Sequence, residues 1–451
     1  MIRAPIVSIL CVLAASGCGS YRLIHSGQVN TRAASRVETK LVATRGLRFR
    51  LPVPLQAETV AEARTTLERE LRAQYSSEDL AKLSRVYGAL GLVPSGTNLE
   101  RAYLDLYGQQ VAGFYDPIDQ RMVMVEGAIT PDLLTGMLEG VLRRDLSGEL
   151  VLAHELTHAL QDQHFGLDVG RNDLGEDDAQ LARHAVYEGD ATLAGFAVVL
   201  GGLKPSQAVA LAEKLEGVPG ILASTYPDIP DAVRQTLVFQ YVAGVNFVSW
   251  AYQRAGWDGV NALLSHPPFS TEQILHPEKY FVRAEYPLAV RVSGLAPYLQ
   301  AGWQVVEDST LGEFTVQVLG DQFLPRQQAQ TMAAGWDGDR LLALGHDDDL
   351  ALVWLTAWDT EQDAVEFFSA YGAIAAAKHP GAPATTAETV LTSAGASPYR
   401  IERQGAKVLV IEGPLDGDLG RAAARIWHHS TYQQSIPSAP LDLASRAASI
   451  R

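Results

Sequence analysis

The sequence predicts an α+β fold in which an α-rich domain with a small sheet is followed by a small α+β module. With 451 residues, the chain is longer than one hydrophobic core usually serves, so two folded units are expected. Apolar residues recur at helical spacing in most segments between residues 58 and 254, whereas shorter strand-like runs follow residue 340. Hydrophobic residues make up 47% and charged residues 20%, a balance typical of globular proteins.

The first residues predict an exported chain. Arg3 precedes an apolar stretch over residues 6–15, which is too short to span a bilayer and suits a signal peptide. Small residues at 15–17 precede Cys18, as in the cleavage motif of bacterial lipoproteins, where the cysteine becomes the acylated first residue. We therefore expect a signal peptide at 1–17, lipidation of Cys18 and an extracytoplasmic, membrane-anchored location in the cell envelope. The alternatives are a signal peptide without lipidation and an N-terminal anchor helix.

Residues 18–50 are predicted to be a tether between the lipid anchor and the folded domain, because they carry seven basic residues and no apolar periodicity. The only cysteines are Cys11, inside the predicted signal peptide, and Cys18. A disulfide framework and a thiolate zinc site are therefore excluded.

The charge of the chain argues against nucleic acid as a partner. The formal net charge is −16, and binding to phosphates requires a cationic surface. Acidity otherwise indicates only solubility and repulsion of anionic partners.

The α-rich domain is expected over residues 51–300. Helical spacing predicts a helix pair over 58–75 and 77–90, and a hairpin of two strands over 111–115 and 121–125 follows. Three features complete the domain: a helix to about residue 165 with Ser147 at its N-cap, a helix from Asp177 or Asp178 to Leu200, and further helices over 206–215 and 232–254.

The accessory module is expected over residues 314–451, after a boundary somewhere in 285–313. Strands are predicted over 341–344, 350–357 and 407–412, with a helix over 360–377. The Ala/Pro/Thr-rich patch over 380–398 is interpreted as a loop or linker.

The HELTH pattern formed by residues 154–158 predicts a metal site. Residues i and i+4 lie on one face of a helix, so His154 and His158 can present two imidazole nitrogens to one ion while Glu155 points at the same space. Zinc suits imidazole and carboxylate ligands, and it acidifies its bound water so that a nearby carboxylate can take the proton. We predict Zn²⁺ as the cofactor and Glu155 as the general base.

A third protein ligand is needed, and Glu188 is the candidate because it lies on a second predicted helix after a loop that can return the chain. His184 is the rival, one helical turn away on the same face. Either residue could be the ligand and the other its neighbour, and His184 could also be a solvent-facing residue before the site.

The segment AHELTHALQDQ at residues 153–163, followed by EGDA at 188–191, resembles the gluzincin clan of zinc metallopeptidases, and especially its largely uncharacterised prokaryotic members. The resemblance covers roughly residues 100–285. It implies a zincin-like, thermolysin-like catalytic domain in which His154, His158 and Glu188 bind zinc, Glu155 activates water, and the substrate is a peptide or protein.

One position departs from the clan's pattern. Thermolysin relatives carry an aspartate four residues after the glutamate ligand, where it orients the first histidine, and this chain has Thr192 there. Because a ligand imidazole normally donates its other N–H, Asp190 or a main-chain carbonyl is expected to substitute.

The donor that would stabilise an oxyanion is also unassigned. His276, Tyr280 and Tyr187 are candidates, although a structural role is favoured for each. The strand at 123–125 is a hypothetical docking edge for an extended peptide, and an ordinary core hairpin is at least as good an interpretation.

These observations predict a zinc-dependent hydrolase, specifically a metallopeptidase. One alternative is a non-catalytic cell-envelope binding or assembly lipoprotein with a structural or vestigial metal site. Another is zinc-dependent hydrolysis of a non-peptide amide.

Overall fold

The computed structural model describes residues 21–110, 112–128, 139, 142–167, 177–215, 227–380, 384–395, 397–415 and 418–434. The predicted signal peptide and Cys18 lie outside these residues. Among the helices described, none is by itself long and apolar enough to cross a membrane. The bent pair Asp178–Leu200 and Pro205–Leu215 passes that test only when the two are taken together.

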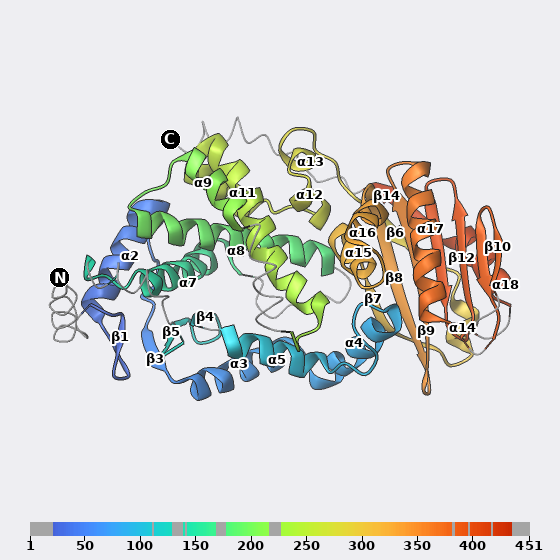
Figure 1. Cartoon of the computed structure of the whole chain (residues 1–451), viewed down its shortest axis with the longest axis horizontal. Helices are drawn as coiled ribbons and strands as arrows, with labels where there is room; N and C mark the ends of the chain where they lie inside the picture. Colours follow the sequence, from blue (N-terminus) through green and yellow to red (C-terminus); the bar gives the residue numbers. More distant parts are fainter. Residues whose placement is uncertain are drawn as a thin grey trace, which may run out of the picture.

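The fold is α+β, as predicted, with helices dominating the N-terminal part and a large sheet the C-terminal part (Figure 1). The main helices of the N-terminal part are α2 (Thr31–Arg45), α3 (Val60–Gln74), α4 (Ser77–Leu90), α5 (Leu99–Gln110), α7 (Leu146–Phe165), α8 (Asp177–Leu200), α9 (Pro205–Leu215) and α11 (Asp231–Ser265). Short elements complete it: β1 (Ile24–His25), β2 (Gln28–Val29), α12 (Thr271–Leu275) and α13 (Glu278–Phe281).

Local signals explain why the predicted helix pair forms where it does. Thr59 and Glu62 form a reciprocal capping box at the start of α3, and the Ser76 side chain caps α4. Gly91 ends α4 in the left-handed conformation. The N-cap of α7 is Asp145, whose side chain accepts from the Gly148 N–H, and not Ser147 as predicted.

A three-stranded sheet lies beside α7, in the order β3 (Leu55–Glu58), β5 (Arg121–Val125), β4 (Gly113–Asp116). The predicted hairpin is β4 and β5, which pair antiparallel, while β3 adds to the other side of β5 in parallel. Because β5 is central, its two edges are occupied by β3 and β4. The hypothesis that strand 123–125 docks a peptide is therefore wrong, and the outer edges of this sheet belong to β3 and β4.

The prediction of a tether over 18–50 is wrong for residues 21–50. Thr31–Arg45 forms a helix whose residues Val37 and Leu41 are buried against the apolar faces of α7 and α8. The buried residues of this helix are Ala33, Ala34, Val37, Leu41 and Arg45, which follow the i, i+3, i+4 pattern of an amphipathic helix. Basic residues on its outer face obscured that pattern in the sequence.

The C-terminal part contains a seven-stranded antiparallel sheet in the order β10-β11-β12-β13-β9-β8-β7. Its strands are β7 (Gln304–Ser309), β8 (Trp336–His346), β9 (Asp349–Trp358), β10 (Ala384–Ala387), β11 (Val390–Ser393), β12 (Tyr399–Gln404) and β13 (Lys407–Glu412). Around it lie β6 (Leu288–Arg291), α14 (Ala296–Gln300), α15 (Gly312–Asp321), α16 (Arg326–Ala333), α17 (Glu361–Lys378), α18 (Leu419–His429) and β14 (Thr431–Gln434).

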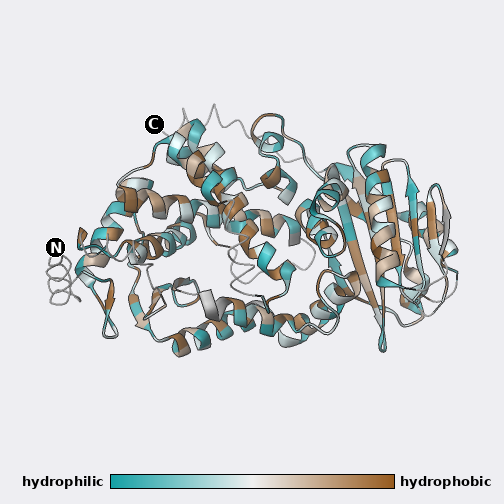
Figure 2. Ribbon diagram, in the orientation of Figure 1, coloured by the Kyte–Doolittle hydropathy of each residue, from teal (hydrophilic) through white to brown (hydrophobic). Residues whose placement is uncertain are grey.

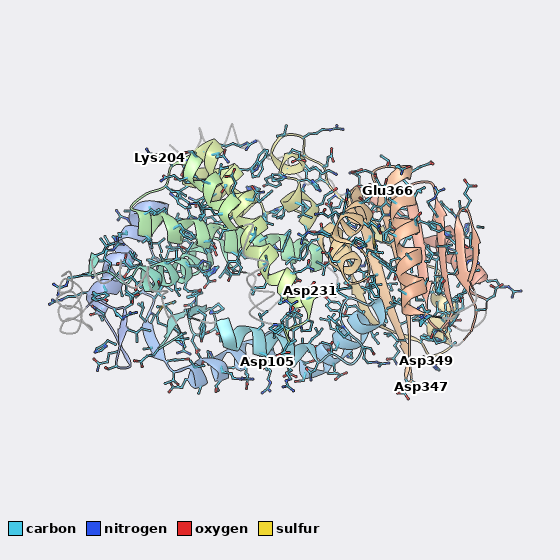
Figure 3. The ribbon with its side chains drawn as sticks, in the orientation of Figure 1. Asp105, Lys204, Asp231, Asp347, Asp349 and Glu366 are labelled. Atoms are coloured by element: carbon cyan, nitrogen blue, oxygen red, sulfur yellow. The ribbon has the colours of Figure 1, made fainter. Side chains whose placement is uncertain are left out.

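Both faces of this sheet are covered. Trp354 and its neighbours on one face pack against α17, α15 and α16, while Val353 and the alternate residues pack against α18 and the β6–β14 pair. Hydrophobic residues gather on the strands and where α8 meets α11, whereas outward helix faces are hydrophilic (Figure 2). Asp347 and Asp349 project from the tip of the β8–β9 hairpin (Figure 3), so this turn is exposed to solvent.

The sheet of the module begins with β7 at 304–309, inside the region 285–313 where the boundary was expected. One prediction for the module is corrected. The patch at 380–398 is not simply a loop, since its described residues include the hairpin of β10 and β11. Its threonine and valine residues favour strands, a preference that the surrounding Ala and Pro residues masked.

Glu412 ties β13 to α17 at the centre of the module. Its buried carboxylate accepts from the Tyr371 hydroxyl at 2.5 Å, from Lys378 Nζ at 2.7 Å and from His379 Nε2 at 3.0 Å. Burial alone would raise the pKa of Glu412, but Lys378, His379 and Tyr371 lower it to about 2. The carboxylate is therefore ionised in the folded protein at all ordinary pH values.

We predict that Glu412→Gln destabilises the protein by about 3 kcal/mol at pH 7, because it leaves the Lys378 ammonium buried without its counter-charge. The unfolded carboxyl has an ordinary pKa near 4.5, above the folded value of about 2. The stabilisation is therefore complete above about pH 4.5 and is lost as pH falls toward 2. Urea unfolding of wild type and variant from pH 7 to pH 3.5 measures this. A difference in stability that stays constant over that range contradicts the assignment.

Candidate metal centre

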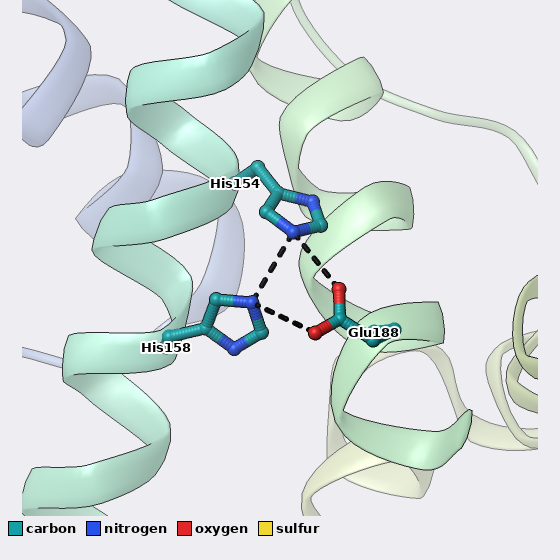
Figure 4. A group of neighbouring side chains, drawn as sticks. All are labelled: His154, His158 and Glu188. Atoms are coloured by element: carbon teal, nitrogen blue, oxygen red, sulfur yellow. Dashed lines mark hydrogen bonds and ion pairs between the residues drawn. The ribbon is translucent and has the colours of Figure 1, made fainter. Parts of the chain in front are cut away.

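Three potential ligands converge between α7 and α8 (Figure 4). His154 Nε2 lies 3.2 Å from His158 Nε2 and 3.1 Å from Glu188 Oε2. His158 Nε2 lies 3.6 Å from Glu188 Oε1. These side chains are only 13–19% exposed, so the cluster is recessed but open to small molecules.

The spacing of these atoms fits zinc. Zn–N and Zn–O bonds of about 2.0–2.1 Å in tetrahedral geometry place neighbouring ligand atoms about 3.3–3.4 Å apart. The three separations of 3.1, 3.2 and 3.6 Å bracket that value. Two imidazoles and one carboxylate are also a ligand set of catalytic zinc sites, which keep one further position open. The structure thus groups Glu188, and not His184, with the two histidines.

A close helix crossing brings Glu188 to this point. A Cβ atom on Gly189 would lie 2.4 Å from the backbone of Gly244 in α11, and one on Gly244 would lie 2.1 Å from the Ala185 carbonyl oxygen. Only glycine at both positions lets α8 and α11 approach this closely. Gly189 of the EGDA segment therefore allows α8 to pack closely against α11, and the adjacent Glu188 faces α7.

The charges of the three ligand residues favour binding of a cation. Burial alone would raise the pKa of Glu188, but the facing His158 and His154 hold it well below its ordinary value. Burial would likewise lower the pKa of His158, yet the Glu188 carboxylate raises it to about 10. A recessed carboxylate that keeps its negative charge requires positive charge beside it, which a proton or a metal ion supplies.

Glu155 is oriented by the small sheet. The Tyr115 N–H on β4 donates to Glu155 Oε2 at 3.0 Å, and the other oxygen, Oε1, lies 3.9 Å from His154 Nε2. Burial raises the pKa of Glu155, with Glu188 adding to the rise and the histidines and the Tyr115 N–H opposing it. The Tyr115 hydroxyl donates to Asp162 on the next turns of α7 at 2.8 Å, which fixes β4 against the helix.

A hydrogen-bonded chain sets the tautomer of His158. Gln161 Nε2 donates to the Asp190 carboxylate and to the Tyr187 carbonyl, both at 3.0 Å. Its amide oxygen therefore faces His158 Nδ1, 2.9 Å away, and accepts from Nδ1–H. That leaves the lone pair of His158 on Nε2, directed at the ligand cluster, as a metal ligand requires.

Arg45, on α2, is the last residue in this series of hydrogen bonds. Its Nη2 lies 3.0 Å from Asp190 Oδ2 and 3.0 Å from Asn261 Oδ1, and its guanidinium lies over the Trp257 ring at 4.6 Å. The Arg45 and Asp190 side chains are 0% exposed. Asp190 thus acts on His158 through Gln161, and not on His154 as predicted. Neither Gln161 nor Arg45 was predicted, although Gln161 lies one helical turn after His158.

The remaining predicted residues lie elsewhere. His184 is exposed and belongs to the wall of a neighbouring cavity. His276 Nε2 contacts Glu313 at 3.0 Å, and the Tyr280 hydroxyl donates to the His266 carbonyl at 2.5 Å. α13, which carries Tyr280, and α12, which His276 follows, lie away from α7 (Figure 1), and no contact of either side chain with the ligand cluster is seen among the described residues. Thr192 is buried, and its hydroxyl has no hydrogen-bond partner among the described residues.

Comparison with known proteins identifies only the module. Residues 300–423 match the model of a family described as a domain of unknown function (DUF8575). Neither the comparison with curated proteins nor that with solved structures gives a match. The matched segment contains none of the three ligand residues, so the argument for function rests on the geometry of the centre.

The ligand assignment predicts different metal contents for two neighbouring variants. Glu188→Ala removes a ligand and should reduce bound zinc to a small fraction of one ion per chain after dialysis against a weak chelator. His184→Ala changes an exposed position one helical turn away and should keep the full amount. Metal analysis of both proteins decides the point, and full zinc in Glu188→Ala with loss in His184→Ala would reverse the assignment.

The hydrogen bonds that link Arg45 to His158 lead to a prediction about zinc affinity. Arg45 contacts no metal ligand, yet its loss should weaken zinc binding. Arg45→Met, made together with Asp190→Asn so that no unpaired charge is buried, should weaken zinc binding about tenfold to 100-fold. Arg36→Met on the exposed face of the same helix is the matched control and should bind zinc like wild type. Competition with a chromogenic chelator measures both. Equal affinity in all three proteins, with folding intact by circular dichroism, contradicts the role of Arg45.

Proposed function

We propose that the chain is a zinc-dependent metallopeptidase of the gluzincin type, with His154, His158 and Glu188 as metal ligands and Glu155 as general base. The observation that carries the proposal is the convergence of two Nε2 atoms and one carboxylate on a single point, with a second carboxylate beside them. Structural zinc sites are closed by four protein ligands, whereas three ligands and an adjacent base are typical of hydrolysis.

Zinc held by these residues would supply Lewis acidity, which acidifies a water molecule and polarises a substrate carbonyl. Glu155 would take the proton of that water. One of its oxygens is fixed by the Tyr115 N–H, so the other is left to face the ligand cluster. Burial raises the pKa of Glu155 above its ordinary value, and a higher pKa makes a carboxylate a better proton acceptor.

The outer edge of β4 supports a peptide as substrate. The Val125 N–H donates to the Ala112 carbonyl at 2.9 Å, which sets the alternation of the antiparallel ladder. By that alternation, the backbone groups of Gly113 and Tyr115 point away from β5, and the Tyr115 N–H indeed reaches Glu155. Because Glu155 accepts from the Tyr115 N–H, an extended peptide would pair with the backbone groups of Gly113 and with the Tyr115 carbonyl, and would pass across the metal centre.

The N-terminal segment supports a location for this activity. The apolar stretch at 6–15 and the small residues before Cys18 favour export and lipid anchoring, which would place the peptidase outside the cytoplasm at a membrane. The substrate would then be a peptide or protein of the cell envelope.

The general-base assignment predicts that Glu155→Gln keeps zinc but lowers kcat by about 10²–10⁴-fold, because the amide cannot take a proton. Zinc content and cleavage of a quenched fluorescent peptide library are measured on the same preparation. Wild-type turnover in zinc-loaded Glu155→Gln contradicts the mechanism. If zinc-loaded wild type cleaves no peptide, the centre serves binding or another amide instead.

A further inference from the structure

Charge is divided unevenly along the chain. Residues 21–50 carry seven lysines and arginines and one acidic residue, which gives a formal charge of +6. Residues 51–451 carry 28 lysines and arginines and 51 acidic residues, which gives a formal charge of −23. The first described segment, which contains α2, is therefore a cationic part of a strongly anionic protein.

The outer face of α2 presents arginines to solvent. Arg32 and Arg36 are exposed, lie one helical turn apart and are on the side opposite the buried residues of the helix. Ser35, the exposed residue between them, is small and leaves both guanidinium groups accessible. Arg48 and Arg50 are exposed after the helix ends, so they add positive charge near its other end.

The two arginines of the outer face receive no counter-charge from the described part of the protein. Among the described residues, the ion pairs of segment 21–50 are Lys40 with Glu149 at 3.6 Å and Arg45 with Asp190 at 3.0 Å. The planar guanidinium groups of unpaired arginines suit phosphate, to which each can donate two parallel hydrogen bonds. This face therefore has the charge and the donors that bind phosphate groups.

The start of α2 lies close to the predicted lipid anchor. Tyr21, the first described residue, follows Cys18 by three residues, which span at most about 11 Å. The Asn30 N–H donates to the Leu23 carbonyl at 2.8 Å, which holds the start of α2 beside the point where the described chain begins. An acyl group on Cys18 would therefore bring the outer face of α2 within reach of lipid headgroups.

The same entry point is fixed to the helix of the metal centre. The Leu23 N–H donates to Asp145 Oδ2 at 2.9 Å, while Asp145 Oδ1 caps α7 by accepting from the Gly148 N–H. The buried face of α2 also packs against α7 and α8. A surface that holds α2 would thus hold the metal centre in a set orientation. The C-terminal module lies at the opposite end of the molecule (Figure 1).

The charge distribution favours an anionic lipid surface as the occupant of this face. Such a surface attracts basic side chains that lie within about one Debye length, ~8 Å at physiological salt. The same surface repels the charge of −23 on residues 51–451. Attraction and repulsion therefore select the same orientation, with α2 toward the membrane.

We propose that the outer face of α2, through Arg32 and Arg36, docks on anionic lipid headgroups and orients the metal centre at the membrane surface. The inference rests on the proposed location in the cell envelope, and it is independent of the peptidase activity. It gives the basic residues of segment 21–50 a role that a simple tether would not require.

The test measures contact between residue 35 and headgroups in the mature, acylated chain. That chain lacks Cys11 and has Cys18 blocked, so Ser35→Cys supplies a single thiol for a fluorophore on the outer face. The protein is reconstituted in phosphatidylcholine vesicles with and without phosphatidylglycerol, all containing a headgroup spin label that quenches at near contact. We expect quenching in the anionic vesicles. It should be absent in the neutral vesicles and in about 1 M NaCl, where the Debye length is about 3 Å.

Arg32→Gln combined with Arg36→Gln should lower the ratio of docked to undocked protein at least about tenfold. The matched control is Arg101→Gln combined with Arg283→Gln, which removes the same charge from side chains that are 81% and 88% exposed elsewhere. It should dock like wild type. The same fluorophore on Thr331→Cys, at an exposed position of α16, should stay unquenched.

Equal quenching in neutral and anionic vesicles, no quenching in either, or quenching that persists without the two arginines would overturn the proposal. Retention by an immobilised acidic peptide, without quenching in vesicles, would assign the face to a protein partner instead.

The proposed location and the docking face fail separately. A wild-type mature chain that reacts with the fluorophore has a free Cys18, which removes the lipid anchor. Sedimentation of that chain with phosphatidylglycerol vesicles, lost when both arginines are replaced, would still support the docking face, and no sedimentation would remove it. Neither measurement depends on peptide cleavage.

Discussion

The buried ion pair between Arg45 and Asp190 is the interaction on which the metal centre depends. Taking both charges out of water is costly, and their attraction offsets that cost only where further partners complete the geometry. Asn261 and the face of Trp257 supply partners to Arg45, and Gln161 donates to Asp190. Because these residues come from α2, α7, α8 and α11, one charged pair fixes four helices relative to one another directly behind a ligand histidine.

The residues that follow His158 on α7 each make a different structural contact. Gln161 orients His158, and Asp162 holds Tyr115 of the small sheet. Gln163 accepts from the Arg50 N–H at 2.7 Å and donates to the Leu51 carbonyl at 3.0 Å. The ALQDQ segment therefore binds the chain that leaves α2 and the strand that orients Glu155. Helix α7 thus carries His154, Glu155 and His158, and it also holds the neighbouring segments of the site in place.

Local features could be predicted from the sequence, and distant pairings could not. His154, Glu155 and His158 follow from spacing within one helix, and the bounds of α4 and α8 follow from capping residues and periodicity. Glu188 was chosen for its place on a second predicted helix and had His184 as a rival, because nothing in its own segment names its partner. Arg45 was hidden among the basic residues of an apparent tether, since its partner Asp190 lies 145 positions away. The β10–β11 hairpin was missed because its Thr-rich strands gain stability from pairing with β12.

Two folded units were expected, with a boundary somewhere in 285–313, and the residues on either side of it pack closely together. One hydrophobic core runs from α4 and α11 into α15 and the sheet. Within it the rings of Phe239 and Phe314 stack, with their centroids 4.1 Å apart. At the same junction a Cβ on Gly312 would overlap the buried Asp178 carboxylate, which accepts from Thr271. Domains joined through a continuous apolar core and buried polar contacts do not move as separate bodies. The module is therefore fixed against α8, which carries Glu188, and against α11, whose Tyr241 stacks on His154.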